Sequence, residues 1–452
     1  MYDKVYQGLG QALKTDFYEL TMSAAYFQNN IDTLTTFELF IRKLPDNRSY
    51  LVFAGLEQVI EYLLNLRFTK KEILFLKRMP TFKYVKRDFF DYLRDFRFNG
   101  DLWSVPEGTI VFENEPIIRV TANIIEAQII ETFILSMINF QTLVATKASR
   151  VVYAAKGKPV VDFGSRRAHG PEAGILAARA SYIGGCIGTS NVYAGYKFGI
   201  PVYGTAAHSY TMAFDSELES FKKYYDTFPE TTVLLIDTYD IEEGARNAVK
   251  IGQSLKGVRI DSDNIIEKSK KVRRILDKAG LHNAKILGSG DLNEYKIDKI
   301  LKEKAPVDMF GVGTEMVTSR DDPALGGVYK LVEQITDDGI KYRAKFSIEK
   351  ATYPGKKQIF RRYDNNGMMK EDILTLANAK KPQGTEPLLK NYIKNGKLMK
   401  KLPELSQIRN TTVRNLKKLP NKYKNLYKVV HFRVKISPEL KRLFRKLQNL
   451  YT

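Results

Sequence analysis

The sequence predicts an α/β fold with an irregular, incomplete α/β barrel at its centre. Short apolar runs recur from residue 159 onward, and most are followed by a stretch with helical periodicity. The runs begin roughly 20 to 40 residues apart, the spacing that a strand, a crossover and a helix need in a parallel sheet. Polar residues follow nearly every run, as they do where barrel strands converge on one mouth. A doubly wound sheet has the same alternation and is the alternative to a barrel.

The predicted parallel strands lie in the middle of a chain of 452 residues. They are 159–164, 201–205, 232–237, 257–261, 285–289 and 307–312, with 328–332 as a candidate seventh strand. Helices are predicted between them, for example over 241–255 and 265–278, where apolar residues recur at helical intervals. The predicted domains are an N-terminal α+β domain (1–145), the barrel domain (146–335) and a C-terminal region (336–452).

The N-terminal domain mixes helical and strand patterns. Its predicted elements are a helix that begins after Thr15 and Asp16, a strand over 36–42, helices within 70–99, and an antiparallel pair formed by 107–112 and 117–120.

Most of the net charge of +21 lies in the C-terminal region, which is basic from about residue 380. From Lys380 to the end there are 20 Lys or Arg residues against 3 acidic residues, so the rest of the chain carries only about +4. Apolar residues such as Leu416, Leu426 and Leu443 interrupt the segment, and we therefore predict a packed, mostly helical extension. A basic surface also attracts phosphates, so binding of RNA or DNA is the less favoured alternative.

The cysteine content and the apolar segments favour a cytoplasmic protein. Cys186 is the only cysteine, which excludes an internal disulfide and a thiolate zinc site. The first residues lack the basic flank and apolar stretch of a secretory signal. The most apolar segment, 124–144, contains Glu126 and Glu131, which are costly in lipid, so no membrane span is predicted.

Three glycine-containing strand ends are candidates for binding phosphate. They are Gly204-Thr205, Gly288-Ser289-Gly290-Asp291 and Gly311-Val312-Gly313-Thr314. Glycine lets backbone amides approach an anion closely, although a plain turn uses glycine as well. Neither a P-loop nor a dinucleotide-binding glycine motif follows any predicted strand.

Charged side chains at other strand ends complete the candidate site. Arg166 and Arg167 follow the first strand and suit a carboxylate or a phosphate, unless they only pair with nearby acids. His208 lies in a second such loop, in a chain with only 4 histidines. Asp237 and Asp261 end neighbouring strands and are candidate Mg²⁺ or ribose contacts, with capping of the following helix as the equal alternative.

Together with several other motifs, these residues resemble the nicotinate phosphoribosyltransferase family, over about residues 10 to 375. The matching motifs are Thr15-Asp-Phe-Tyr-Glu-Leu-Thr-Met22, Phe163-Gly-Ser-Arg-Arg-Ala-His-Gly-Pro171, Gly188-Thr-Ser-Asn191, Gly204-Thr-Ala-Ala-His-Ser209, Gly257-Val-Arg-Ile-Asp-Ser262, Gly311-Val-Gly-Thr314 and Gly326-Gly-Val-Tyr-Lys-Leu331. The resemblance implies an irregular α/β barrel, a homodimer with shared active sites, and transfer of phosphoribosyl from phosphoribosyl pyrophosphate (PRPP) to nicotinate. It also implies ATP as a co-substrate and Mg²⁺ as the cofactor.

The resemblance implies roles for individual residues. Tyr18 borders the nicotinate ring, Arg259 holds its carboxylate, and Thr205 and Arg166 lie beside it. His208 is transiently phosphorylated by ATP. The residues expected to bind PRPP are Arg166, Arg167, Ser289, Gly290, Gly311, Gly313 and Thr314. Arg259, Asp237 and Asp261 are also expected to support catalysis.

Two rival functions and one departure from the family pattern accompany this expectation. Enzymes specific for nicotinamide tend to carry an acid near the position of Ser190, where this chain is neutral. The other rival is a catalytically impaired relative that binds polyanions through its basic C-terminal region. The family commonly has Asp-Ser-Gly-Asp where this chain has Asp261-Ser262-Asp263-Asn264, so an acid replaces a glycine.

Overall fold

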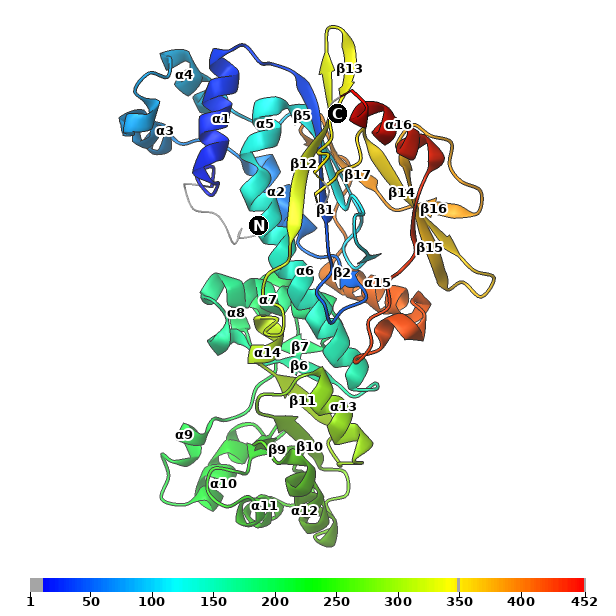
Figure 1. Ribbon diagram of the computed structural model, residues 1–452. Coiled ribbons are helices and arrows are strands. Elements are labelled where there is room, and N and C mark those ends of the chain that lie inside the picture. Colours follow the sequence, from blue (N-terminus) through cyan, green and yellow to red (C-terminus); the bar gives the residue numbers. More distant parts are fainter. Residues whose placement is uncertain (1–10, 348–349, 451–452) are drawn as a thin grey trace. The chain divides into compact units, whose positions relative to one another are not determined.

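The computed structural model describes residues 11–347 and 350–450, which form two compact units (Figure 1). The first unit contains the described residues up to 143 and from 324 onward, and the second contains 144–323. Helix α6 (Glu131–Ala154) begins in the first unit and ends in the second. The N-terminal residues used to argue against a secretory signal lie outside the described ranges.

The second unit contains a six-stranded parallel sheet, which confirms the predicted α/β class. Its strand order is β7-β6-β11-β10-β9-β8. The strands are β6 (Val160–Asp162), β7 (Gly188–Thr189), β8 (Val233–Leu235), β9 (Gly257–Asp261), β10 (Lys285–Ser289) and β11 (Met309–Val312). Five of the six predicted runs therefore form strands of this sheet.

The edges of this sheet differ from the prediction. The run 201–205 contributes only a parallel bridge between Val202 and Thr189, which extends the sheet beyond β7. Strand β7 has only two residues, too few to produce an alternating pattern in the sequence. Among the described residues no pairing joins β8 to Val202 at the other edge, so the sheet is open.

The candidate seventh strand was assigned to the wrong sheet. Residues 328–332 lie in β12 (Gly327–Thr336) of the first unit, where they pair antiparallel with β1 (Leu34–Ile41). The ring of Tyr329 stacks on that of Phe37 with centroids 4.8 Å apart. An apolar run of this length shows that a strand is buried, but it does not identify the partner strand.

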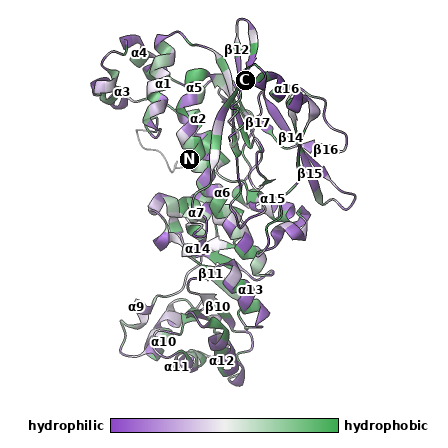
Figure 2. Cartoon of the chain, in the orientation of Figure 1, coloured by the Kyte–Doolittle hydropathy of each residue, from purple (hydrophilic) through white to green (hydrophobic). Residues whose placement is uncertain are grey.

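Helices cover the sheet of the second unit. They are α7 (Pro171–Ile183), α8 (Val192–Phe198), α9 (His208–Thr211), α10 (Glu217–Thr227), α11 (Ile241–Val249), α12 (Ile265–Lys278), α13 (Glu294–Lys302) and α14 (Thr314–Val317). Helix α11 begins where the Asp240 carboxylate accepts hydrogen bonds from two backbone amides of its first turn. Helices α10, α11 and α12 lie beside one another in Figure 1, and Figure 2 shows polar and apolar residues alternating along α12.

The first unit is built on sheets that are antiparallel except where β15 pairs in parallel with β19. Its largest sheet has the order β13-β12-β1-β5-β3-β17-β18, and a second sheet has the order β16-β14-β15-β19. The remaining strands are β2 (Leu51–Val52), β3 (Asp101–Ser104), β4 (Ile110–Val111), β5 (Ile118–Asn123), β13 (Gly339–Tyr342), β14 (Lys357–Tyr363), β15 (Met369–Leu376), β16 (Thr385–Pro387), β17 (Lys390–Lys394), β18 (Lys397–Leu398) and β19 (Val434–Ile436).

The helices of the first unit agree with the N-terminal prediction wherever that prediction placed one. They are α1 (Phe17–Gln28), α2 (Leu56–Asn65), α3 (Lys70–Arg78), α4 (Arg87–Asp95), α5 (Ile124–Ile129), α15 (Leu405–Lys418) and α16 (Pro438–Gln448), with short 3-10 turns η1 (Pro80–Phe82) and η3 (Asn421–Lys424). Helix α1 begins after Asp16, and α3 and α4 lie in the segment predicted to be helical.

The predicted antiparallel pair in this unit is wrong. Strand β4 pairs with β2, whereas β5 lies between β1 and β3. Since both edges of β5 are already hydrogen-bonded, it has no free edge for β4.

The C-terminal region is mixed rather than mostly helical. Helices α15 and α16 alternate with strands β16 to β19, and β17 pairs with β3 of the large sheet. Several of its cations have acidic partners, for example Lys435 with Glu371 at 2.8 Å. The region is therefore part of the core of the first unit.

One helical segment, Ile124–Ala154, is long and apolar enough to cross a membrane by length and composition alone, and 67% of its most apolar window is buried inside the protein. Its acidic residues have internal partners, since Glu126 accepts from the Asn99 amide at 2.8 Å and Glu131 accepts from Gln128 at 2.9 Å. These contacts are those of a core helix.

Candidate active site

Arg259 is the centre of the site in the second unit. From β9 its guanidinium donates from Nε to Ser289 Oγ (2.8 Å), from Nη1 to Thr205 Oγ1 (3.0 Å) and from Nη2 to Asp261 Oδ2 (2.9 Å). Only 13% of its side chain is exposed. Four residues singled out in the sequence thus form one hydrogen-bonded group, which we call the Arg259 cluster.

The ring of Phe163 supports the Arg259 cluster. Its centroid lies 5.5 Å from the central carbon of the Arg259 guanidinium, within the range of a cation–π contact. Gly311 packs against this ring, and a Cβ atom there would lie 2.4 Å from it, so only glycine fits. Phe163 stands in one of the family motifs but was not predicted to be a site residue, although its place directly after β6 puts it at the mouth of the sheet.

The hydroxyl of Ser289 lies between two charged groups of the Arg259 cluster. It accepts from Arg259 and donates to Asp261 Oδ1 at 2.9 Å, and the residue is 2% exposed. The hydroxyl of Ser289 therefore makes its hydrogen bonds to other groups of the protein.

Asp237 and Asp261 lie side by side at neighbouring strand ends, but they differ in how many of their carboxylate oxygens have a hydrogen-bond partner. Asp237 Oδ2 accepts from the Asp261 amide at 2.7 Å, whereas its buried Oδ1 has no hydrogen-bond partner. Both carboxylate oxygens of Asp261 are occupied, one by Ser289 and one by Arg259. Burial raises the pKa of Asp237, and the hydrogen bond from Asp261 opposes that rise.

Neither aspartate caps the helix that follows it. The N-cap residue of α11 is Asp240 and that of α12 is Asn264. The capping alternative for Asp237 and Asp261 is therefore excluded.

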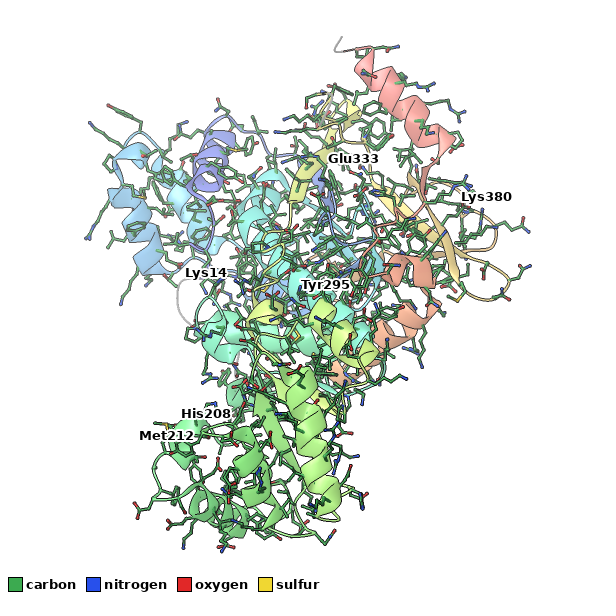
Figure 3. The ribbon with its side chains drawn as sticks, turned by 60° about the horizontal axis from the view of Figure 1, so that its bottom comes forward. Lys14, His208, Met212, Tyr295, Glu333 and Lys380 are labelled. Atoms are coloured by element: carbon green, nitrogen blue, oxygen red, sulfur yellow. The ribbon has the colours of Figure 1, made fainter. Side chains whose placement is uncertain are left out.

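His208 is the first residue of α9 (Figure 3) and lies close to the end of β8. Its Nδ1 is 3.2 Å from the hydroxyl of Thr238, the residue after Asp237. The imidazole and the Asp237 carboxylate also interact electrostatically, and this interaction opposes the rise that burial causes in the pKa of the aspartate. These contacts bring His208 to the same strand ends as the Arg259 cluster.

The two predicted arginines lie on the 3-10 turn η2 (Ser165–Arg167), and both are exposed. No hydrogen bond within the described part of the second unit links either guanidinium to the Arg259 cluster. The turn packs against α14, whose first residue is Thr314.

A buried network lies beneath this turn. Asp162 accepts from the Thr189 hydroxyl (2.7 Å) and the Gly164 amide (2.9 Å), and Asn191 donates to Ser165 Oγ (3.1 Å). Complete burial raises the pKa of Asp162 to about 6, against the opposing effect of its two hydrogen bonds.

The glycine segments follow two neighbouring strands, β10 and β11. Gly290 has φ 97° and lies against the 261–262 backbone, where a Cβ would be 3.2 Å from the Ser262 amide nitrogen. A Cβ on Gly313 would lie 3.3 Å from the Phe163 carbonyl oxygen. Both segments therefore approach the strand ends closely.

Tyr18 is on α1 of the first unit, with 45% of its surface exposed.

Comparison with known proteins identifies the family. The chain matches the nicotinate phosphoribosyltransferase (NAPRTase) family over residues 159–341, the N-terminal domain of that enzyme over 13–139 and its C-terminal domain over 380–444. It is 42% identical to a nicotinate phosphoribosyltransferase of Mycobacterium tuberculosis, over 92% of this chain and 89% of that protein. The chain belongs to the nicotinate phosphoribosyltransferase family.

Other members support the same assignment. A nicotinate phosphoribosyltransferase of Bacillus subtilis is 41% identical, over 77% of this chain and 73% of that protein. The crystal structure of the human nicotinic acid phosphoribosyltransferase superposes with a TM-score of 0.84 at 25% identity, over 96% of this chain and 99% of that one. The family match to residues 380–444 extends beyond the segment in which the motifs predicted a resemblance.

Proposed function

We propose that the protein transfers the phosphoribosyl group of PRPP to nicotinate, which gives nicotinate mononucleotide and pyrophosphate. The observation that carries the proposal is the Arg259 cluster, a guanidinium oriented by Asp261 of its own strand and by Ser289 and Thr205 from other parts of the sheet. Family membership and the close relatives named nicotinate phosphoribosyltransferase point to the same reaction.

Arg259 is suited to bind the nicotinate carboxylate. A guanidinium has five N–H donors, and Arg259 uses three of them within the protein. The two that remain, on Nη1 and Nη2, can donate to a carboxylate, whereas an amide offers one acceptor and brings unpaired donors. The neutral Ser190 gives a substrate amide no acidic acceptor, so the proposal favours nicotinate over nicotinamide.

The phosphate groups of PRPP would lie against the glycine segments after β10 and β11. Backbone amides of Gly290, Gly311, Gly313 and Thr314 are the proposed donors, and the exposed Arg166 and Arg167 supply positive charge. In the reaction, the pyridine nitrogen attacks C1 of the ribose as the bond from C1 to the pyrophosphate oxygen breaks. No proton has to be removed from the attacking nitrogen, so positioning and electrostatic stabilisation are the main tasks of the protein.

The residues present fit a bound Mg²⁺ that is held partly by substrate. Within the described residues no group of three or more His, Cys, Asp or Glu side chains is arranged to hold a metal. Magnesium, however, is commonly bound by one or two carboxylates together with substrate phosphates and water. The free Oδ1 of Asp237 is the proposed protein ligand, and the ion would neutralise charge on the pyrophosphate.

ATP is the proposed co-substrate, and His208 is the proposed site of its phosphoryl transfer. Nδ1 is engaged with Thr238, so Nε2 is the ring nitrogen left to attack the γ-phosphate. The bond from that phosphorus to the β,γ-bridging oxygen breaks and ADP leaves. Hydrolysis of the phosphohistidine then returns the imidazole and releases phosphate.

The finer architecture belongs to the same proposal. The hydrogen bond between Arg259 of β9 and Thr205, beyond the opposite edge of the open sheet, is what an irregular, incomplete barrel would produce. A homodimer is proposed because the second unit exposes apolar side chains on and near α8, including Val192 at 72% and Tyr196 at 75%. Tyr18 would border nicotinate in the shared sites, and the enzyme would act in the cytoplasm.

A turnover assay tests the proposal. The purified protein should release pyrophosphate from PRPP with nicotinate, faster when ATP and Mg²⁺ are present, and much more slowly with nicotinamide. Equal turnover of nicotinamide would favour the first rival function. Absence of turnover together with salt-sensitive binding of RNA would favour a role for the basic C-terminal region.

A further inference from the structure

A buried ion-pair cluster in the second unit has no role in the proposed chemistry. Lys147, on α6, is 0% exposed, and its Nζ lies 2.7 Å from Glu294 Oε2, 2.9 Å from Asp321 Oδ1 and 3.7 Å from Glu315 Oε2. Glu294, also 0% exposed, has a second cationic partner in Arg150, whose Nε is 2.9 Å from Oε1. Charges buried this deeply are costly unless each is paired.

The carboxylates of this cluster come from the segments that follow β10 and β11. Glu294 is the first residue of α13, three residues after Asp291. Glu315 directly follows Thr314, the first residue of α14. Since β10 and β11 are paired in the sheet, the single ammonium group of Lys147 joins the two segments proposed to bind phosphate.

The segment after β10 has an unusual backbone conformation that contacts on both sides must stabilise. Gly290 has φ 97° and Asp291 has φ 40°, and the left-handed region is less favourable than the right-handed one for any residue other than glycine, although aspartate tolerates it better than most. Such a backbone persists only where its surroundings fix it from both sides. On one side the hydroxyl of Ser289 is held by the Arg259 cluster, and on the other side Glu294 is held by Lys147 and Arg150.

We propose that Lys147 is a positioning residue that holds segments 290–294 and 313–315 at the spacing that the phosphate groups of PRPP require. This inference rests on the proposed function and adds a residue to it. Lys147 does not touch substrate itself, because it is buried and its ammonium group faces three carboxylates of the protein.

The competing interpretation is that the cluster only stabilises the fold. Removal of one partner of a buried ion pair lowers stability whether or not the pair also positions other groups, so a stability measurement alone does not separate the two roles. The affinity for PRPP does, since only the positioning role links Lys147 to the substrate.

The test is PRPP binding by calorimetry, with Mg²⁺ and the full-length protein. Lys147→Met should raise the Kd for PRPP by about tenfold, because small misplacements of binding groups are costly. The KM for nicotinate should stay within about twofold, since Arg259 is held by other residues. The matched control is Arg361→Met, which removes a buried ion pair with Asp372 (2.9 Å) from the first unit and should leave PRPP binding unchanged.

Asp321→Asn is the milder variant, because Asp321 is 19% exposed and the other two carboxylates stay in place. It should raise the Kd for PRPP by about threefold in a folded protein, a fraction of the effect expected for the lysine variant. Folded variants that bind PRPP as tightly as the wild type would overturn the positioning role alone. A wild-type protein that binds no PRPP would overturn the proposed function instead.

Discussion

The hydroxyl of Ser289 links Arg259 to Asp261, since it accepts from the guanidinium at 2.8 Å and donates to the carboxylate at 2.9 Å. Loss of this hydroxyl frees Nε of Arg259 and leaves Asp261 with one oxygen unpaired. Ser289→Ala should therefore raise the KM for nicotinate by about tenfold or more, since a hydrogen bond to a charged group contributes about 1.5 to 3 kcal/mol. Steady-state kinetics with each substrate varied in turn measures this change.

Ser262→Ala is the control for this variant. Ser262 follows Asp261 in the chain, and its buried hydroxyl has no hydrogen-bond partner, so its removal should leave both KM values unchanged. If Ser289→Ala raised the KM for PRPP instead, the serine would bind the phosphoribosyl substrate, as the sequence predicts.

The two aspartates should differ in their effect on magnesium. Asp237 has an unpartnered oxygen, whereas Asp261 has none. Asp237→Asn should therefore raise the Mg²⁺ concentration for half-maximal activity by about tenfold, and Asp261→Asn by less than about twofold. Titration of activity with Mg²⁺ at saturating nicotinate checks both. The reverse order would make Asp261 the magnesium ligand.

The sequence could predict which strand ends form the site, but not how their side chains share hydrogen bonds. Arg259, Thr205 and Asp261 were identified because polar residues after apolar runs meet where parallel strands end. Both carboxylate oxygens of Asp261 accept hydrogen bonds, whereas one oxygen of Asp237 has no partner. This difference depends on side-chain rotamers and on the paths of the loops. Sequence spacing contains no information of that kind.

The sequence also did not predict which strands pair with each other. The run 328–332 and the pair at 107–120 were recognised as strands, yet each bonds to a strand distant in the chain. Apolar alternation reports which face of a strand is buried and leaves its neighbour undefined. The basic C-terminal region was misjudged for a related reason, because short strands such as β16 and β19 give no periodic pattern.

ATP coupling should depend on His208. His208→Ala removes the proposed phosphate acceptor, so ATP should no longer accelerate turnover, whereas slow transfer without ATP should persist. Transfer of label from the γ-phosphate of ATP to the protein, lost on mild acid treatment, is the direct measurement. His282→Ala is the matched control, since the His282 side chain is 71% exposed and its imidazole contacts Asp277, away from the strand ends. Label retained in His208→Ala would assign the acceptor to another residue.

The pH dependence of stability should reveal the raised pKa of Asp162. Burial raises its pKa from an ordinary 3.8 to about 6 in the folded protein, so the folded state holds the proton more tightly than the unfolded chain. The stabilisation from this proton is complete below the unfolded pKa and is lost as the pH rises through the folded value. Between about pH 3 and pH 7 the free energy of unfolding should therefore lose about 3 kcal/mol from this residue.

Asp162→Asn isolates this contribution, because the amide is neutral throughout and can still accept from the Gly164 amide as Asp162 does. Urea unfolding of both proteins across this range should give a wild-type stability that falls relative to that of the variant as the pH rises. The variant should then match or exceed the wild type at neutral pH, since burial of an ionised carboxylate is avoided. Parallel curves would mean that Asp162 has the same pKa in the folded and unfolded states, so that the hydrogen bonds from the Thr189 hydroxyl and the Gly164 amide balance the effect of burial.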